Sequence, residues 1–426
     1  MFDSGDRTVS RRAVLGGAVA GVAGDALGPA RAAYAGGMPS EGDPVDAVAA
    51  QLDRDLIALR RDLHRHPELP GQERRTAEVV ARRLRAAGLD VTTGVGGHGV
   101  VGVLEAARRG RTVAYRADID AVPPEDQLSG GTQVAHLCGH DVHTAVGVGV
   151  AEVLAHLRDR LAGTFVFVFQ PAEEALSGAA AMLDDGVLAR TRPTEIHALH
   201  CGPFPVGEFV VTPGFGLPGQ DHGVITLTGP DATARAQRLA AAIGALGTVS
   251  PPSTPEALER FVADLLTPDG PLSTFVFMQV QTADTTGGAE VRMSYRCWPE
   301  DRYEDVRADI GRLARSHGGT PVFPKDPYPA MLCPEWEGHV LKRHLEQTIG
   351  PDRVRTIQAA VPFSGEDFAL FLDRIPGTYT FLGVMAPGAP ITTGYPHFGA
   401  FNPDERAIGH GVRAMARWLA VRAARR

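Results

Sequence analysis

The sequence lacks long apolar runs, an excess of positive charge and an abundance of cysteine. No apolar run of about 18 residues interrupts the body of the chain, which excludes a multispanning membrane protein. Lysine and arginine together number 42 against 50 aspartates and glutamates, so the net charge is −8. This mildly acidic balance argues against nucleic acid and anionic membrane surfaces as partners.

Cysteine occurs only four times, as Cys138, Cys201, Cys297 and Cys333. In an exported protein an even number of cysteines ordinarily suggests disulfides. Cys138, however, stands among residue types that bind metals, which leaves three cysteines for pairing. We therefore expect no structural disulfide in this protein.

The first 32 residues have the layout of an export signal. Arg11 and Arg12 precede a weakly apolar stretch rich in glycine and alanine, and a small-x-small cleavage pattern ends at Ala32. The paired arginines indicate the twin-arginine route. We therefore expect a secreted or extracytoplasmic protein with no membrane insertion after signal cleavage. The alternative is a disordered tail with a chance arginine pair. Residues 33–46 are interpreted as a linker.

The remaining chain is too long for one ordinary core and has the pattern of an α/β protein. Helical periodicity is found at residues 51–64, 74–87 and 144–157, and short apolar or β-branched runs at 100–104, 112–115 and 164–169. The last run is apolar throughout, as expected for a strand buried on both faces. Strands separated by helices of this length indicate a mainly parallel sheet.

The pattern changes near Gly214 and returns to α/β character after Pro327. Between these points, strands are predicted at 223–227, 274–280 and 289–295, and helices at 232–246, 255–266 and 304–317. Further helices at 335–349, 366–372 and 406–424 and a strand at 378–384 follow. We therefore divide the chain into a first α/β part at 47–213, an inserted small α+β domain at 214–325, and a second α/β part at 326–426.

The strongest local signal for chemistry is the segment from His136 to His143, which holds three histidines, a cysteine and an aspartate. Cys138 and His140 are two residues apart, so on extended backbone their side chains point to the same side. Thiolate and imidazole are natural zinc ligands. Asp141 and His143 are placed to hydrogen-bond to a metal-binding side chain and so to orient it, without binding the metal themselves. The alternative is a polar turn with incidental histidines.

A second signal is the adjacent pair Glu173 and Glu174, directly after the buried strand predicted at 164–169. The carboxyl ends of parallel strands are where α/β proteins place their sites. Adjacent side chains diverge, so one carboxylate can bind a metal while the other takes a proton from the attacking water. The alternative is a solvated helix N-terminus, where glutamate is favourable for electrostatic reasons.

Single histidines are weaker signals. His200 ends a short apolar run, and His397 lies in a loop rich in aromatic residues. A lone histidine near the end of a strand is more often structural than a metal ligand, so neither residue would be selected by itself.

Several segments taken in order change this view. They are Arg61 to Leu69, Tyr115 to Pro123, Cys138 to Asp141, Gln170 to Glu174, Leu199-His200, Ser364 to Phe368, and His397 with Asp404-Glu405. The set resembles the zinc-peptidase-like amidohydrolases, which include hippurate, N-acyl-amino-acid and indoleacetyl-amino-acid hydrolases. The resemblance covers nearly all of residues 50–212 and 326–420.

The resemblance implies a catalytic α/β domain with a lid domain inserted into it, and a site for two divalent metal ions. The positions that bind metal in the family correspond here to Cys138, His140, Glu174, His200 and His397. The thiolate favours zinc, while manganese, cobalt and nickel stay open as alternatives.

Other roles follow from the same resemblance. Glu173 corresponds to the general base. Asp118 and Asp120 stand where related peptidases carry a His-x-Asp metal motif, and in this chain we expect them to act as supporting residues. Glu366 and Asp367 belong to a segment that closes over the site in relatives.

The inserted domain departs from the family pattern. Relatives usually begin it with Gly-Gly-His-Ala, whose histidine binds substrate or the oxyanion, often across a dimer. Residues 228–233 replace that segment here and contain no histidine. Arg296 stands where relatives have an arginine after a strand, and is expected to bind a substrate carboxylate.

The resemblance therefore implies a metal-dependent amidohydrolase or peptidase that acts on an N-acyl amino acid or small peptide through a metal-activated water. Its partners would be a small-molecule amide or peptide substrate and a second copy of the chain in a homodimer. The alternative is a metal- or ligand-binding homologue that has lost turnover because its lid motif is altered.

Overall fold

The computed structural model describes residues 42–128 and 130–425. The export signal predicted at 1–32, and all but the last residues of the predicted linker, lie outside these ranges. Within them, no helix is long and apolar enough to cross a membrane.

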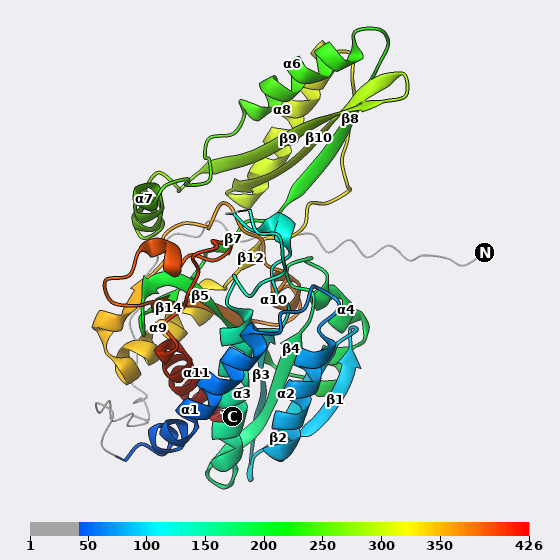
Figure 1. The fold of residues 1–426 in the computed structure, drawn as a ribbon. Helices are drawn as coiled ribbons and strands as arrows, with labels where there is room; N and C mark the ends of the chain where they lie inside the picture. The colour runs from blue at the N-terminus through cyan, green and yellow to red at the C-terminus, as the bar shows by residue number, and fades with distance from the viewer. Residues whose placement is uncertain (1–41, 129, 426) are drawn as a thin grey trace, which may run out of the picture. The chain divides into compact units, whose positions relative to one another are not determined.

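The described part of the chain contains both helices and strands (Figure 1). The helices are α1 (Pro44–His64), α2 (Arg74–Ala86), α3 (His140–His156), α4 (Gly178–Asp184), α5 (Val187–Thr191), α6 (Ala232–Gly244), α7 (Pro255–Leu265), α8 (Tyr303–Ser316), α9 (Glu335–Ile349), α10 (Ala369–Leu372) and α11 (Arg406–Ala424). The strands are β1 (Asp90–Val95), β2 (Gly99–Glu105), β3 (Arg108–Asp118), β4 (Ala162–Gln170), β5 (Glu195–Pro205), β6 (Phe209–Val211), β7 (Gly216–Leu217), β8 (Asp221–Thr228), β9 (Phe275–Thr285), β10 (Gly288–Trp298), β11 (Pro321–Val322), β12 (Met331–Leu332), β13 (Val354–Thr356) and β14 (Gly377–Met385).

The largest sheet has eight strands in the order β1-β2-β4-β3-β5-β14-β6-β13. Its central pairs β4·β3, β3·β5 and β5·β14 are parallel, whereas β1·β2 and β2·β4 at one edge are antiparallel. The predicted mainly parallel α/β sheet is confirmed. Because β3, β4 and β5 run in the same direction, the segments that follow them meet at one edge of the sheet.

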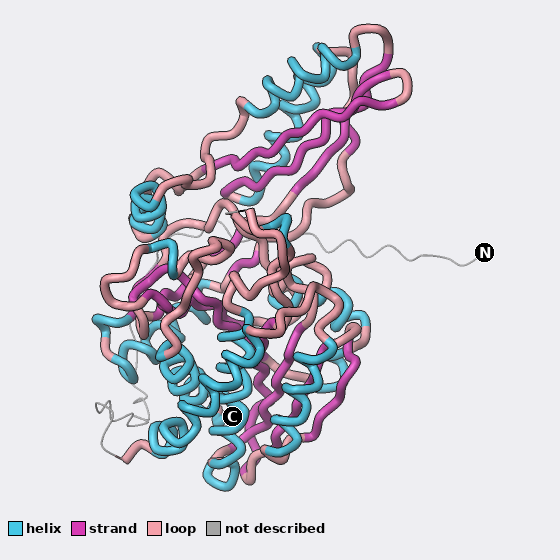
Figure 2. Tube along the Cα trace, viewed as in Figure 1, coloured by secondary structure: helices cyan, strands magenta, loops and turns pink. Residues whose placement is uncertain are grey.

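Both faces of this sheet are covered by helices (Figure 2). In β4, Phe165, Phe167 and Phe169 pack into the core beneath α1, α2, α3 and α11. The alternate residues Val166 and Val168 pack into a second core with α4, α5 and α10. The strand predicted at 164–169 to be buried on both faces is thus confirmed, and its lack of polar alternation has a direct cause.

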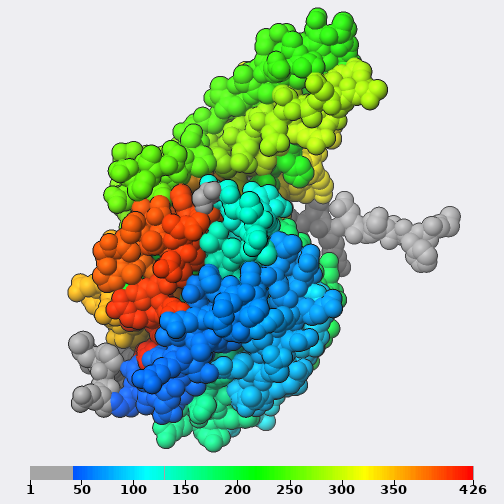
Figure 3. Space-filling view, viewed as in Figure 1, coloured from blue at the N-terminus to red at the C-terminus, as the bar shows by residue number. Residues whose placement is uncertain are grey.

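A second sheet, of four strands in the order β11-β8-β10-β9, lies within residues 214–325. Helices α6 and α8 pack on one of its faces through residues that include Leu239 and Ile310. Helix α7 belongs elsewhere: Phe261 and Leu265 join Phe204 and Ile357 in a separate apolar cluster. In the space-filling view the surface of α7, in green, meets the orange surface of the C-terminal segments (Figure 3).

Two of the differences between the predicted and the observed boundaries have a clear local cause. Helix α1 begins at Pro44, inside the predicted linker and seven residues before the predicted start, because the Asp43 side chain accepts a hydrogen bond from the backbone N–H of Val45 at 2.9 Å. The helix predicted at 366–372 is reduced to α10, since the side chains of Glu366 and Asp367 are buried in polar contacts instead.

A buried ion pair fastens the last helix to the large sheet. Arg422 of α11 donates a hydrogen bond from Nε to Glu195 of β5 at 2.7 Å, and Nε2 of His197 lies 3.5 Å from the same carboxylate. Burial opposes ionisation of Glu195, yet the contacts with His197 and Arg422 outweigh it and lower the pKa of this carboxyl to about 2.

We therefore expect Glu195→Gln to lower the free energy of unfolding by about 3–5 kcal/mol at neutral pH, because Arg422 loses its buried partner. The folded-state pKa lies below the ordinary value of 4.5, so this contribution is present above pH 4.5 and is lost as pH falls toward about 2. Urea unfolding at a series of pH values measures it. The control is Glu290→Gln, whose partner Arg292 is exposed, with an expected change below about 1 kcal/mol. A loss for Glu195→Gln that is independent of pH would contradict the assignment.

Candidate active site

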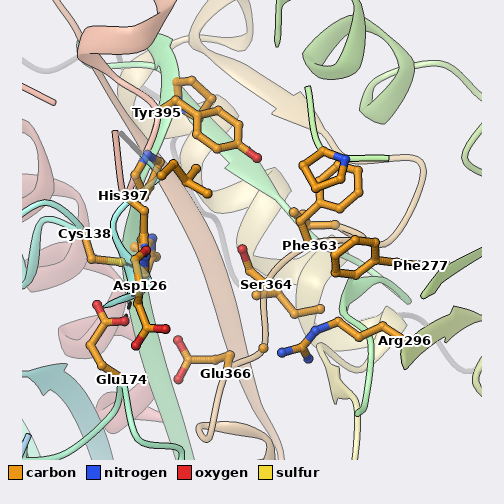
Figure 4. Close-up of a pocket in the computed structure, with 18 of the residues that line it drawn as sticks. Asp126, Cys138, Glu174, Phe277, Arg296, Phe363, Ser364, Glu366, Tyr395 and His397 are labelled. Atoms are coloured by element: carbon orange, nitrogen blue, oxygen red, sulfur yellow. Dashed lines mark hydrogen bonds and ion pairs between the residues drawn. The ribbon is translucent and has the colours of Figure 1, made fainter. Parts of the chain in front are cut away.

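The predicted site residues gather at the edge of the large sheet where β3 and β4 end and α3 begins. A cavity of about 510 Å³ opens there, and its walls include Cys138, Glu173, Glu174, His200 and His397. Figure 4 shows Cys138, Glu174 and His397 together on one side of this cavity.

The segment before α3 depends on Gly139. Its backbone has φ of 96°, in the left-handed region, and a Cβ at this position would lie 2.7 Å from Sγ of Cys201. Only glycine therefore fits. Helix α3 starts at the next residue, His140, rather than at residue 144 as predicted, so Cys138 and His140 do not share one extended segment. Cys138 lines the cavity, and a ring nitrogen of the buried His140 lies within 4.8 Å of its Sγ.

The loop after β4 is held by two buried carboxylates. Oε1 of Glu73 accepts a hydrogen bond from the N–H of Ala172 at 2.9 Å, where φ is 51°. Oδ2 of Asp120 accepts one from the N–H of Glu174 at 2.9 Å. These bonds hold the chain in a tight turn. Glu173 and Glu174 do not diverge as predicted, because the turn brings a carboxylate oxygen of each within 4.8 Å of the other and of a ring nitrogen of His140.

The two single histidines complete the cluster. His200 lies on β5, with Nε2 3.3 Å from Sγ of Cys138. His397 comes from the loop before α11, with Nε2 3.4 Å from Oε2 of Glu174. Its φ of 67° is unusual for a residue other than glycine. Strained backbone of this kind is concentrated at functional sites.

The hydrogen bonds of the three histidines orient each of them for metal binding. Nδ1 of His140 lies 3.0 Å from Oδ1 of Asp120, and Nδ1 of His200 and of His397 lie 2.8 and 3.0 Å from backbone carbonyl oxygens. Protonated Nδ1 atoms would donate these bonds and leave Nε2 as a free ligand atom. Burial also holds the pKa of His200 well below its ordinary value, which keeps that ring neutral.

The arrangement fits two ions. Ligand atoms of Cys138, His140 and His200 lie within 4.8 Å of one another, and so do those of Cys138, Glu174 and His397. Cys138 is common to both groups. Nε2 of His140 and Oε1 of Glu174 are buried and have no hydrogen-bond partner among the described residues. Such atoms are costly unless a ligand satisfies them, and a divalent ion would do so.

The predicted supporting residues divide into two kinds. Nδ1 of His143 lies 2.6 Å from Oδ1 of Asp118, and Nε2 accepts a hydrogen bond from the N–H of Cys201 at 2.8 Å. His143 therefore has no free ligand atom and acts as a support. Asp141 instead contacts Arg60 and His64, each at 2.8 Å, on the side of α1. Its support for the site is indirect.

The sequence does not predict the buried network of ion pairs centred on Arg116. Arg116 contacts Asp118 at 2.6 Å, Glu366 at 2.9 Å and Asp367 at 3.1 Å. Glu366 lines the cavity, and Asp367 is fully buried next to it. Carboxylate atoms of Glu173, Glu366 and Asp367 lie within 4.8 Å of one another. Burial, then the charge of Glu366, raises the pKa of Glu173 well above its ordinary value.

Arg296 enters the cavity from the inserted sheet, across from the metal-ligand cluster (Figure 4). It donates hydrogen bonds to Oε1 of Gln220 at 2.8 Å and to the carbonyl oxygen of Pro218 at 3.3 Å. Among the described residues its hydrogen-bond acceptors are these two neutral oxygens, and neither is a carboxylate. A guanidinium with only neutral acceptors is suited to an anionic group of a bound molecule.

Comparisons with known proteins give a consistent result. The profile of peptidase family M20/M25/M40 matches residues 114–421. N-acetylcysteine deacetylase of Bacillus subtilis is 30% identical over 369 residues, which are 83% of this chain and 93% of the relative. Thermostable carboxypeptidase 1 of Saccharolobus solfataricus is 30% identical over 391 residues, 86% of this chain and 95% of the relative. Among solved structures, a dinuclear metal-binding peptidase of the M20 family from Bacillus subtilis matches with a TM-score of 0.67 and 26% identity, covering 88% of this chain and 99% of that one.

Proposed function

Since this chain belongs to peptidase family M20/M25/M40 and is a metal-dependent amide hydrolase, we propose that it cleaves the amide bond of N-acyl amino acids or small peptides that carry a free carboxylate. The observation that carries this proposal is the pair of ligand groups sharing Cys138, with Glu173 beside them and Arg296 across the cavity.

Cys138, His140 and His200 would hold one ion, and Cys138, Glu174 and His397 the other. Two bound divalent ions would polarise the amide carbonyl and favour deprotonation of a water molecule near neutral pH. The thiolate supports zinc as the native metal, with manganese, cobalt and nickel as the alternatives.

Glu173 moves the proton in this reaction. Its carboxylate takes a proton from the attacking water, and the water oxygen bonds to the carbonyl carbon. The C–N bond then breaks, and Glu173 delivers the proton to the leaving amine. Burial and the neighbouring carboxylates favour the protonated form that makes this delivery possible. Arg116 neutralises part of the negative charge of Glu366 and Asp367, whose carboxylates lie within 4.8 Å of that of Glu173.

Arg296 fixes the orientation of the substrate. We assign to it the carboxylate of the leaving amino acid, because it reaches the cavity without a carboxylate partner of its own. Its guanidinium also packs on the backbone of Gly365, where a Cβ would lie 2.8 Å from Nη1. This contact restricts the Arg296 guanidinium to one orientation. The side chain therefore loses little conformational entropy when the substrate binds.

A panel of N-acetyl amino acids and their carboxamides tests this function on the metal-loaded enzyme. We expect release of free amine from the acids, and a kcat/KM for the matching carboxamides that is lower by about 10²-fold. In Arg296→Gln the acids should fall to the level of the carboxamides, with the exposed Arg292→Gln as the control. Absence of amine release from every acid would overturn the proposed function.

Two further proposals concern the setting of the enzyme. The twin-arginine pattern at residues 11–12 supports export, and we propose a secreted or extracytoplasmic location. We also propose a homodimer, which light scattering on the purified protein would test.

A further inference from the structure

The inserted sheet presents a cation and an aromatic ring side by side. Arg296 on β10 is directly opposite Phe277 on β9. Opposed residues of an antiparallel pair project from the same face, with Cβ atoms about 4.5–5.5 Å apart. Both side chains border the cavity, whereas the next opposed pair, Val276 and Cys297, projects from the other face into the core under α6 and α8.

Phe277 is one member of an aromatic wall. Its ring centroid lies 5.1 Å from that of Phe363 at an interplanar angle of 87°. Phe363 in turn lies 5.2 Å from Phe261 of α7. Figure 4 shows Phe277 and Phe363 next to Arg296, on the side of the cavity opposite Cys138 and Glu174. The three rings come from three separate segments and form one apolar surface.

Helix α7 keeps this wall in place. Leu265 is buried in the apolar cluster together with Phe204 and Ile357. The carbonyl oxygen of Leu265 also accepts a hydrogen bond from the N–H of Gln358 at 2.8 Å. Phe261, on the same helix, is therefore held in contact with Phe363. A rigid, close-packed aromatic wall can select substrate side chains by their shape as well as exclude water.

Resting on the proposed function, we propose that the amino acid released by this enzyme carries an aromatic or large apolar side chain, and that Phe277 and Phe363 select it. The carboxylate and the side chain of an amino acid are bonded to the same carbon atom. A carboxylate bound by Arg296 therefore places the side chain against the neighbouring Phe277. Burying a large apolar group there is favourable, and burying a charged one without a partner is costly.

The test keeps the acyl group constant. N-acetyl derivatives of glycine, alanine, leucine, phenylalanine, glutamate and lysine are assayed with the metal-loaded enzyme. We expect kcat/KM for N-acetylphenylalanine to exceed that for N-acetylglycine by about 100-fold or more, with the glutamate and lysine derivatives near the level of glycine. Equal rates, or a preference for a charged side chain, overturn this inference while the amidohydrolase function stands. If no derivative is hydrolysed, the proposed function itself fails.

Variants assign the preference to residues. Phe277→Ala is expected to reduce the phenylalanine-to-glycine ratio by at least about 10-fold, and Phe363→Leu by a smaller factor. The ratio is measured within one preparation, so it does not depend on the fraction of the variant that folds. The control is Phe323→Ala, in the inserted domain but away from the cavity, for which the ratio should not change. An equal loss on both substrates in Phe277→Ala would overturn its role in selection.

Discussion

Glu173→Gln is expected to lower kcat by at least about 10³-fold while leaving the bound metal in place. Glutamine has nearly the same shape but cannot accept the proton of the attacking water or return it to the leaving amine. Glu173 also lines the cavity beside the ligand cluster, so its position suits both transfers. Steady-state release of amine and the metal content of the same preparation measure the two quantities together.

The control for this variant is Glu78→Gln, an exposed glutamate on α2 whose nearest cation, Arg82, is also exposed. It should leave both turnover and metal content unchanged. If Glu173→Gln kept turnover within about 10-fold of the original enzyme, another group would have to serve as the base. A wild-type protein that binds two ions and hydrolyses none of the N-acyl amino acids would instead favour the binding homologue that has lost turnover.

Removal of metal is expected to have an effect of similar size. Dialysis against a strong chelator should abolish amine release, and zinc should restore it. The metal-free protein should also unfold at a lower temperature, because an ion at 1,000 times its dissociation constant stabilises the folded state by about 4 kcal/mol. Calorimetry and activity after reconstitution with zinc, manganese, cobalt or nickel would identify the metal that supports the reaction.

Cys138→Ser tests whether the Cys138 thiolate binds metal, and a control variant shows whether the loss of any buried thiol has the same effect. Because Cys138 belongs to both ligand groups, its replacement should lower the content of both ions to less than one equivalent in total. Cys297→Ser is the matched control, since Cys297 is also a buried free thiol but lies in the core of the inserted sheet. It should retain both ions. Two equivalents in Cys138→Ser would contradict the shared-ligand arrangement.

Much of the local structure could be predicted because its causes are local. The unbroken apolar run of β4 predicts a strand covered on both faces, and the structure has helices on each side. Short elements such as β6 and β13, of three residues each, carry no periodic signal and were missed. The five proposed metal ligands were selected by a resemblance extending over several segments, since His200 and His397 are not distinctive alone.

What the sequence by itself determined is therefore the order of elements, the glycine before α3 and the residue types able to bind metal. Tertiary structure alone decided which distant groups meet. The contact of Arg116 with Glu366, 250 residues apart, depends on the packing of β3 against the C-terminal segment. The packing of α7 beside Phe363 likewise depends on how the inserted segment folds back. Neither contact has a local signal, because side-chain chemistry and short-range periodicity do not encode which distant surfaces become neighbours.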